Sequence, residues 1–278
     1  MSFIIFEFFS MIAPMKKVNT KALTGATMKE QYIRKEAWMK IFNFLKEHEK
    51  IYASGEAKCK KFIEAVYWMM RTGAQWRELP EEYGKWNTVF KRFNEWSKKN
   101  IWNELNNYCI EDPDLEWVMI DATIVRAHAC AAGYKKGQYE EQGLGRSKGG
   151  FTSKMHTLVD ALGNSLKFII TGGNRNDITQ GEELIKNVKD ADVLGDKGYD
   201  SDDFRIIIKN QNCNPVIPGK SNRIVPIEYD KHIYESRHLI ENFFSKIKHF
   251  RRIFSRFDKS LRNFASFVAF AGTILWLR

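Results

Sequence analysis

Cysteine, histidine and proline are scarce in this chain of 278 residues, with four, six and six copies respectively. The cysteines are far apart and form no Cys-x-x-Cys pair, which argues against a disulfide framework and predicts reduced thiols. They are Cys59, Cys109, Cys130 and Cys213. The histidines do not cluster either, and we interpret His128 and His156 as structural. A site for a soft metal is therefore not expected.

Long apolar runs are also missing. The opening MSFIIFEFFSMIAP has no basic start and carries Glu7, so it does not fit a signal peptide, and we interpret residues 1–27 as a poorly defined extension. The segment Phe264–Leu277 is too short and too mixed to span a bilayer, and it predicts a buried terminal helix. These patterns predict a cytoplasmic protein without a membrane partner.

Acidic residues are outnumbered by basic ones, 34 to 44, which gives a formal net charge of +10. Such a charge points to a polyanionic partner, most simply nucleic acid, although a membrane surface would also satisfy it. The hydrophobic content of 44% and aromatic content of 14% predict a folded rather than a disordered chain.

Residues 28–112 show apolar residues at helical spacing, and we predict a small all-α domain there. Three helices and a short fourth near Ile101–Tyr108 are expected, with a core built from six of the eight tryptophans. The third helix carries Lys91 and Arg92 on a basic surface. These side chains either contact DNA phosphates or form a solvated lysine-rich face.

Residues 113–278 alternate strand-like and helix-like segments, which predicts an α/β domain. Asp121 lies within the apolar strand WVMIDATIVRAHA, where it needs either a cation such as Arg126 or a metal ion. Asp196 follows the strand of ADVLGDKGYD, either as a turn residue or as a site residue at the carboxyl end of a strand. Asp177 and Asp200 are predicted helix caps.

Two further segments carry candidate phosphate ligands. The glycine-rich stretch from Ala132 to Gly150 predicts a flexible loop whose Arg146 and Lys148 either bind a phosphate backbone or remain solvated. The stretch YESRHLIENFFSKIKHFRR is predicted to form one amphipathic helix. At 100° per residue one face gathers four polar side chains, Tyr234, Arg237, Glu241 and Lys248. Arg251 and Arg252 follow, and the plainer reading is an i,i+4 pair of Arg237 with Glu241.

The spacing Tyr, two residues, Arg, three, Glu, six, Lys resembles the signature of bacterial insertion-sequence transposases of the DDE class. The phrase RTGAQWRELPEEYGKWNTVFKRFNEW resembles the N-terminal helical domain of transposases of insertion-sequence family five. GRSKGGFTSKMH, GGNRND and GDKGYDS are also similar to phrases of that family. The resemblance covers roughly residues 30–278.

The resemblance implies a ribonuclease-H-like mixed sheet flanked by helices, preceded by the all-α domain. It also implies that Asp121, Asp196 and Glu241 form an acidic triad binding two Mg²⁺ ions, with Mn²⁺ as a substitute, about 4 Å apart. Further implied DNA contacts are Tyr234, Arg237, Lys248, Arg251 and Arg252. The expected partners are double-stranded DNA, as element ends and target, and a second copy of the chain in a synaptic, nucleoid-associated complex.

Two other functions remain compatible with this pattern. A metal-dependent nuclease without strand transfer would use the same fold and the same acids. A DNA-binding regulator with an inactive core is a third hypothesis, and the presence of Asp121, Asp196 and Glu241 argues against it.

Overall fold

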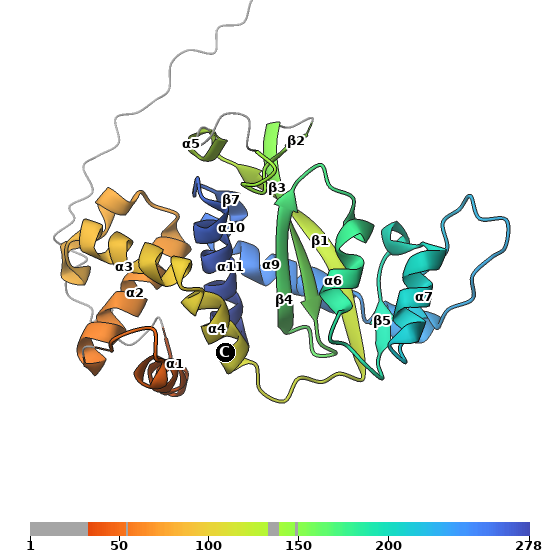
Figure 1. Ribbon diagram of the computed structural model, residues 1–278, viewed down its shortest axis with the longest axis horizontal. Helices are drawn as coiled ribbons and strands as arrows, with labels where there is room; N and C mark the ends of the chain where they lie inside the picture. Colours follow the sequence, from red (N-terminus) through yellow and green to blue (C-terminus); the bar gives the residue numbers. More distant parts are fainter. Residues whose placement is uncertain (1–32, 54, 133–138, 148–149) are drawn as a thin grey trace, which may run out of the picture. The chain divides into compact units, whose positions relative to one another are not determined.

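The computed structural model describes residues 33–53, 55–132, 139–147 and 150–278 (Figure 1). Ile33–Arg278 forms one compact unit. Within the described ranges, no helix has the length and apolar character needed to cross a membrane. The helical and the strand-rich parts of the sequence thus belong to the same folded body.

The predicted helices of the N-terminal part are present. They are α1 (Lys35–Glu47), α2 (Glu56–Thr72), α3 (Trp86–Lys98) and α4 (Ile101–Cys109), with short 3₁₀ turns η3 (Trp76–Glu78) and η4 (Glu81–Tyr83) between α2 and α3. Gly73 ends α2 in the left-handed conformation, with φ +66°, and its N–H donates to Met69 O. A Cβ at Gly73 would lie 3.2 Å from Arg251 Cβ, so glycine also permits close contact with the C-terminal segment.

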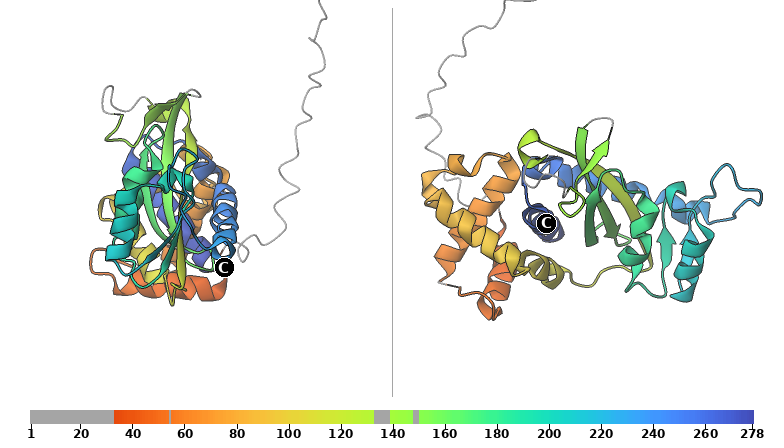
Figure 2. Two further views of the ribbon diagram at one scale, coloured as in Figure 1. Left: turned by 90° about the vertical axis from the view of Figure 1, so that its right-hand side faces the viewer. Right: turned by 45° about the horizontal axis from the view of Figure 1, so that its top comes forward.

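The aromatic core of these helices is completed by the C-terminal helix α11 (Leu261–Trp276). Phe267 of α11 stacks on Phe93 of α3 at 4.4 Å between ring centroids, and Phe270 contacts Trp102 of α4 at 5.1 Å. Figure 2 shows α11, in dark blue, between α4 and the sheet, and α11 also contacts β4. Because α11 packs against both the N-terminal helices and the sheet, the predicted domain boundary between residues 112 and 113 stays a prediction.

The sheet is built around the long strand β1 (Trp117–Ala127). Its members run in the order β4-β3-β1-β5-β6, with β2 pairing β3 and β7 pairing β1 at the margins. β3 is antiparallel to both β1 and β4, whereas β5 and β6 run parallel to β1. This is a ribonuclease-H-like arrangement, as predicted. The bounds are β2 (Gly145–Ser147), β3 (Gly150–Val159), β4 (Ser165–Gly172), β5 (Asp192–Leu194), β6 (Asn214–Val216) and β7 (Ser255–Arg256).

Helices cover both faces of this sheet. Leu184 of α6 (Gly181–Ile185) and Ile208 of α7 (Asp202–Asn210) join the buried cluster that contains Ile120 of β1. On the other face α9 (His238–Lys248) and α11 pack, with Phe243 against Phe168 of β4 at 6.0 Å. The remaining short elements are α5 (Ala129–Ala132), η5 (Asp177–Gln180), η6 (Lys197–Tyr199), α8 (Lys231–Glu235) and α10 (Arg251–Phe254).

The single helix predicted from Tyr234 to Arg252 is wrong: the structure divides this stretch into α8, α9 and α10. Asp230 caps α8 by accepting from the N–H groups of His232 and Ile233. At Ser236 and Arg237 the backbone makes tighter i→i−3 bonds, Leu239 N to Ser236 O and Ile240 N to Arg237 O. Arg237 therefore leaves from a turn between two helices.

The predicted cap at Asp177 is also wrong. Asn176 precedes η5 without a side-chain cap, and α6 begins only at Gly181. The Asp177 carboxylate instead lies 2.9 Å from Lys154 Nζ and 3.8 Å from His156 Nδ1. The Asp177 side chain thus pairs with residues of β3 instead of capping a helix, as the local sequence had predicted.

We predict that Phe267→Ala destabilises the whole unit by about 3–5 kcal/mol, because a buried ring is lost from a core shared by helices and sheet. Urea unfolding followed separately by tryptophan fluorescence and far-UV circular dichroism measures this, and both probes should shift together. Phe254→Ala is the control, since Phe254 is 64% exposed and its loss should cost below about 0.5 kcal/mol. Separate transitions for the two probes would contradict the shared core.

Candidate catalytic site

Asp121 lies on the central strand with a side chain that is only 19% exposed. Its Oδ2 accepts a 2.7 Å bond from Arg237 Nη2, and its Oδ1 accepts from the N–H of Ala122. Burial raises the pKa of Asp121 above its usual range, against the lowering effect of Ala122 N–H and Arg237. The cation that the strand requires is thus Arg237, and not Arg126, the partner considered from sequence.

Asp196 lies just beyond the end of β5 (Asp192–Leu194), the strand that pairs in parallel with β1. β1 and β5 pair in parallel with Met119 opposite Leu194. Asp121 lies two residues after Met119, and Asp196 lies two residues after Leu194. Asp196 Oδ1 accepts a 2.8 Å bond from Gly198 N–H and caps η6. A Cβ at Gly198 would sit 2.8 Å from that oxygen, so glycine lets the backbone approach it. Asp196 thus follows the carboxyl end of β5 next to the middle of β1, and its negative charge contributes to the raised pKa of Asp121.

Glu241 is exposed on α9 and makes no hydrogen bond or ion pair with the residues that the structure describes. It lies two turns before Lys248 on the same side of α9, and Lys248 Nζ donates to Thr123 Oγ1 on β1. Glu241 is therefore on a side of α9 that faces β1. The i,i+4 pair of Arg237 with Glu241, the plainer interpretation of the sequence, is absent from the described residues.

The three acids offer the hard oxygen donors that Mg²⁺ and Mn²⁺ prefer. Several buried polar atoms around them also lack a partner among the described residues: Thr157 Oγ1, whose residue pairs with Asp121 across the strands, Tyr199 Oη and Arg237 Nε. Burial and the nearby Asp121, Asp177 and Asp196 raise the pKa of the Tyr199 hydroxyl, which stays protonated. The donor set fits a divalent metal.

The three acids do not form a metal-binding cluster among the described residues. Across the described ranges, no three His, Cys, Asp or Glu side chains are gathered closely enough to hold an ion. Instead, the guanidinium of Arg237 forms an ion pair with the Asp121 carboxylate. The structure therefore shows Asp121 with its charge neutralised by Arg237, whereas Asp196 accepts, among the described residues, only a backbone N–H.

Comparisons with known proteins identify the family. A family model described as a transposase DDE domain matches residues 113–277, and one described as a putative transposase of the IS4/5 family matches residues 33–106. The chain belongs to the DDE transposase family. The putative transposase for insertion sequence element IS6501 of Brucella ovis is 36% identical over 129 residues, which cover 46% of this chain and 99% of that protein.

Two other similarities add context. The uncharacterized protein y4sN of Sinorhizobium fredii is 36% identical over 104 residues, which cover 37% of this DDE-family chain and 83% of y4sN. A cryo-EM structure of the piggyBac transposase synaptic complex with hairpin DNA aligns at a TM-score of 0.39 with 13% identity. The alignment covers 70% of this chain and 51% of piggyBac, and so low a score supports no argument.

The predicted DNA-contacting residues around α9 differ in solvent exposure and in their contacts within the protein. Tyr234 lies 5.2 Å from Tyr229 between ring centroids, and the guanidinium of Arg237 lies 5.7 Å from its ring. Burial lowers the pKa of Lys248, which is half-buried. Arg251 is exposed.

Arg252 is not free to contact DNA, contrary to the prediction. It is 4% exposed, its Nε and Nη2 donate to the carboxylate of Asp258, and its Nη1 donates to Ala74 O. A neutralising change at Arg252 would leave Asp258 buried and unpaired. This arginine ties α10 to the segment after α2.

The other predicted contacts that the structure describes lie on α3 and β2. Lys91 is exposed on α3, whereas the guanidinium of Arg92 lies 4.3 Å from the Phe62 ring and 4.8 Å from the Trp96 ring. Arg146 is exposed on β2, and Lys148 lies outside the described residues. Lys91 and Arg146 are therefore the freer candidates for phosphate binding.

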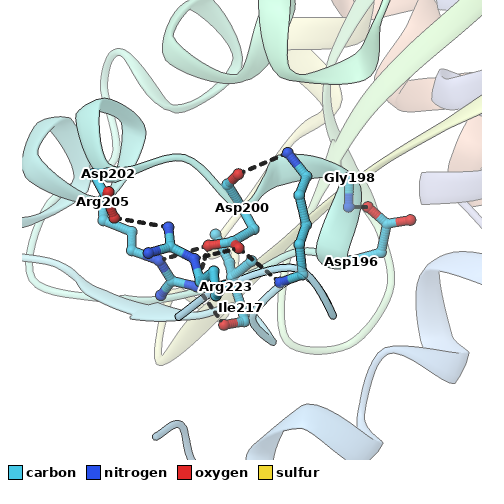
Figure 3. Close-up of polar contacts among 8 residues, drawn as sticks. Asp196, Gly198, Asp200, Asp202, Arg205, Ile217 and Arg223 are labelled. Carbon is cyan, nitrogen blue, oxygen red and sulfur yellow. Dashed lines mark hydrogen bonds and ion pairs between the residues drawn. The ribbon is translucent and has the colours of Figure 1, made fainter. Parts of the chain in front are cut away.

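The buried role of Asp200 has no signal in the local sequence, and Figure 3 shows the polar contacts that surround its carboxylate. Its carboxylate accepts from Arg205 Nε and Nη2, from Arg223 Nε and from Lys220 N–H. Ser201, not Asp200, precedes α7, so the predicted helix cap is wrong. Burial favours the neutral acid, yet Arg223, the Lys220 N–H and Arg205 together lower the pKa of Asp200 to about 2.

The hydrogen bonds of Asp200 with Arg205, Lys220 and Arg223 attach the turn after Asp196 to segments farther along the chain. Arg205 Nη2 also donates to Ile217 O, and Arg223 Nη2 donates to Asp202 (Figure 3). No local pattern reveals the bond of Arg223 to Asp200, because 23 positions separate them. The network holds the backbone that presents Asp196.

We predict that Asp200→Asn costs about 3–5 kcal/mol in the free energy of unfolding, because Arg205 stays buried without its counter-ion. Since the folded pKa is lowered, the stabilisation is present above the unfolded value of about 3.9 and is lost as pH falls toward 2. Urea unfolding at pH 7 and pH 3 measures both effects. Asp203→Asn, exposed on the same helix, should cost below about 1 kcal/mol, and equal losses would refute this role.

Proposed function

We propose that this chain binds the terminal repeats of an insertion sequence, cuts DNA strands there and joins them to target DNA. The proposal rests above all on Asp121 of β1 and Asp196 just after the carboxyl end of the paired strand β5, within the ribonuclease-H-like sheet of a DDE-family chain. Glu241 is the proposed third acid, supplied by α9 on its β1-facing side. Joining two element ends implies at least a homodimer.

Asp121, Asp196 and Glu241 are the proposed ligands for two Mg²⁺ ions, which Mn²⁺ would replace. When bound, the ions would lower the energy of charge that develops on the phosphodiester during cleavage. All three donors are carboxylates, and the free cysteines Cys59, Cys109 and Cys213 are buried, which favours a hard metal. The site then needs an acid from each of three elements, β1, the end of β5, and α9.

The proposed contacts of the chain itself to DNA are cationic and lie on both parts of the unit. Lys248, held against β1 through Thr123, would bind a phosphate next to the acids. Arg146, Lys91 and Arg251 would contact phosphates farther along the duplex. Tyr199 keeps its hydroxyl proton among the acids and so is able to donate a hydrogen bond to a phosphate oxygen.

The decisive variants are Asp121→Asn, Asp196→Asn and Glu241→Gln, which each remove one charge with little change in shape. Loss of about 4 kcal/mol of transition-state stabilisation corresponds to roughly 10³-fold slower cleavage. DNA binding should persist, because no cation is lost. A Mg²⁺-dependent cleavage and strand-transfer assay on element-end DNA measures this, with circular dichroism to confirm folding.

Glu235→Gln is the matched control, since Glu235 is exposed on α8. It should cleave within a few-fold of the parent. If Glu241→Gln cleaves like the parent while Glu235→Gln is inactive, the third acid has been assigned wrongly. Cleavage without strand transfer in the parent protein would favour the nuclease hypothesis.

Exposed cations should contribute mainly non-specific affinity. We predict that Lys91→Gln combined with Arg251→Gln lowers the slope of log K against log salt by up to about two units, since each lost phosphate contact removes about 0.9. Fluorescence anisotropy with a labelled duplex at several salt concentrations measures the slope. An unchanged slope would mean that neither side chain faces DNA.

A further inference from the structure

Arg237 is bound to Asp121 more firmly than to anything else near it. The ion pair is 2.7 Å long, and the two side chains are 15% and 19% exposed. Arg237 Nη1 makes only a long 3.4 Å contact with Tyr234 Oη, and Nε has no partner among the described residues. Burial disfavours the charged guanidinium, yet Asp121, Tyr234 and Asp196 together raise the pKa of Arg237.

This ion pair uses the oxygen that a metal ion would need. Asp121 Oδ1 already accepts from Ala122 N–H, and Oδ2 accepts from Arg237. A divalent cation at Asp121 would therefore compete with the guanidinium for the same carboxylate and be repelled by its charge. In the protein alone, the cation at Asp121 is Arg237.

The backbone around Arg237 offers a way for the side chain to turn away. Arg237 leaves from the turn between α8 and α9, outside both helices, and its side chain already reaches solvent at 15% exposure. A guanidinium binds phosphate oxygens in paired, charge-assisted hydrogen bonds, so a DNA phosphate is a replacement partner of equal chemistry to the carboxylate. Tyr234 lies one helical turn earlier, and its hydroxyl oxygen is 3.4 Å from Arg237 Nη1.

We propose that Arg237 is an exchangeable counter-ion of Asp121 that moves to a DNA phosphate and so makes room for the metal ion. The proposal rests on the proposed function and adds a coupling between its two ligands. DNA would raise the affinity for metal, and metal would raise the affinity for DNA by the same factor, as linkage requires. The protein alone would bind metal weakly, which limits cleavage to the DNA-bound state.

The test measures Mn²⁺ binding to the full-length protein by the loss of the free-ion EPR signal, so that no activity is needed. The parent is titrated alone and with a duplex that already ends at the cleavage point, with Asp121→Asn plus the same duplex as the background. Arg237→Gln is titrated alone. Lys246→Gln removes one exposed cation from α9 without contact to Asp121 and serves as the matched control.

We expect the duplex to tighten Mn²⁺ binding to the parent by about 10-fold or more, equivalent to 1.4 kcal/mol. Arg237→Gln alone should bind Mn²⁺ about as tightly as the parent with DNA, while Lys246→Gln should stay within about 3-fold of the parent. Mn²⁺ should in turn tighten duplex binding to the parent by the same factor. This last comparison needs no variant and so holds even if Arg237→Gln fails to fold.

Equal Mn²⁺ affinity for the parent with and without DNA would overturn the exchange and leave the proposed catalytic metal site standing. Equal effects of Arg237→Gln and Lys246→Gln would also overturn it, since general charge rather than Arg237 would then control binding. If Asp121→Asn with DNA binds Mn²⁺ as well as the parent with DNA, the metal lies elsewhere. That result would refute both the exchange and the assignment of Asp121 as a ligand.

Discussion

The ion pair of Asp121 with Arg237 is the interaction on which the candidate site depends. A half-buried carboxylate on a central strand is costly without a cation, and the strand itself supplies none that reaches it. The cation comes from 116 positions away, from the turn between α8 and α9. The same contact brings the beginning of α9, and with it Glu241, toward the strand that carries Asp121. One charge pair thus links β1 to the turn that precedes α9, the helix that carries the proposed third acid.

The C-terminal helices serve the two halves of the unit together. α11 completes the aromatic core of α3 and α4 and also packs on β4, while Arg252 joins α10 to Ala74 O after α2. DNA contacts on the helical part and chemistry at the sheet edge would therefore be held by a shared core. Such an arrangement suits a transposase, because the position of the bound end relative to the acids decides which bond is cut.

Much of the fold was predictable because its signals are local. Helical spacing of apolar residues predicted α1–α4, and apolar, β-branched runs predicted β1, β3, β4, β5 and β6. The short strands β2 and β7 were not predicted, and β2 lies within the segment that was predicted to be a flexible loop. The acidic triad came from motif resemblance and remains a proposal. Local sequence could not predict the partners of Asp121, Asp177 and Asp200, since Arg237, Lys154 and Arg223 lie far from them in the chain. The break between α8 and α9 at Ser236 was not predicted, because the apolar spacing on the helical wheel continues through it.

A crystal structure of the protein bound to its element-end duplex with Mn²⁺, with anomalous scattering to locate manganese, would test the proposed site. We expect a manganese peak within about 2.2 Å of carboxylate oxygens of both Asp121 and Asp196, with Glu241 turned toward it and Arg237 on a DNA phosphate. Manganese bound at other residues, with Arg237 still paired to Asp121, would contradict the proposed site.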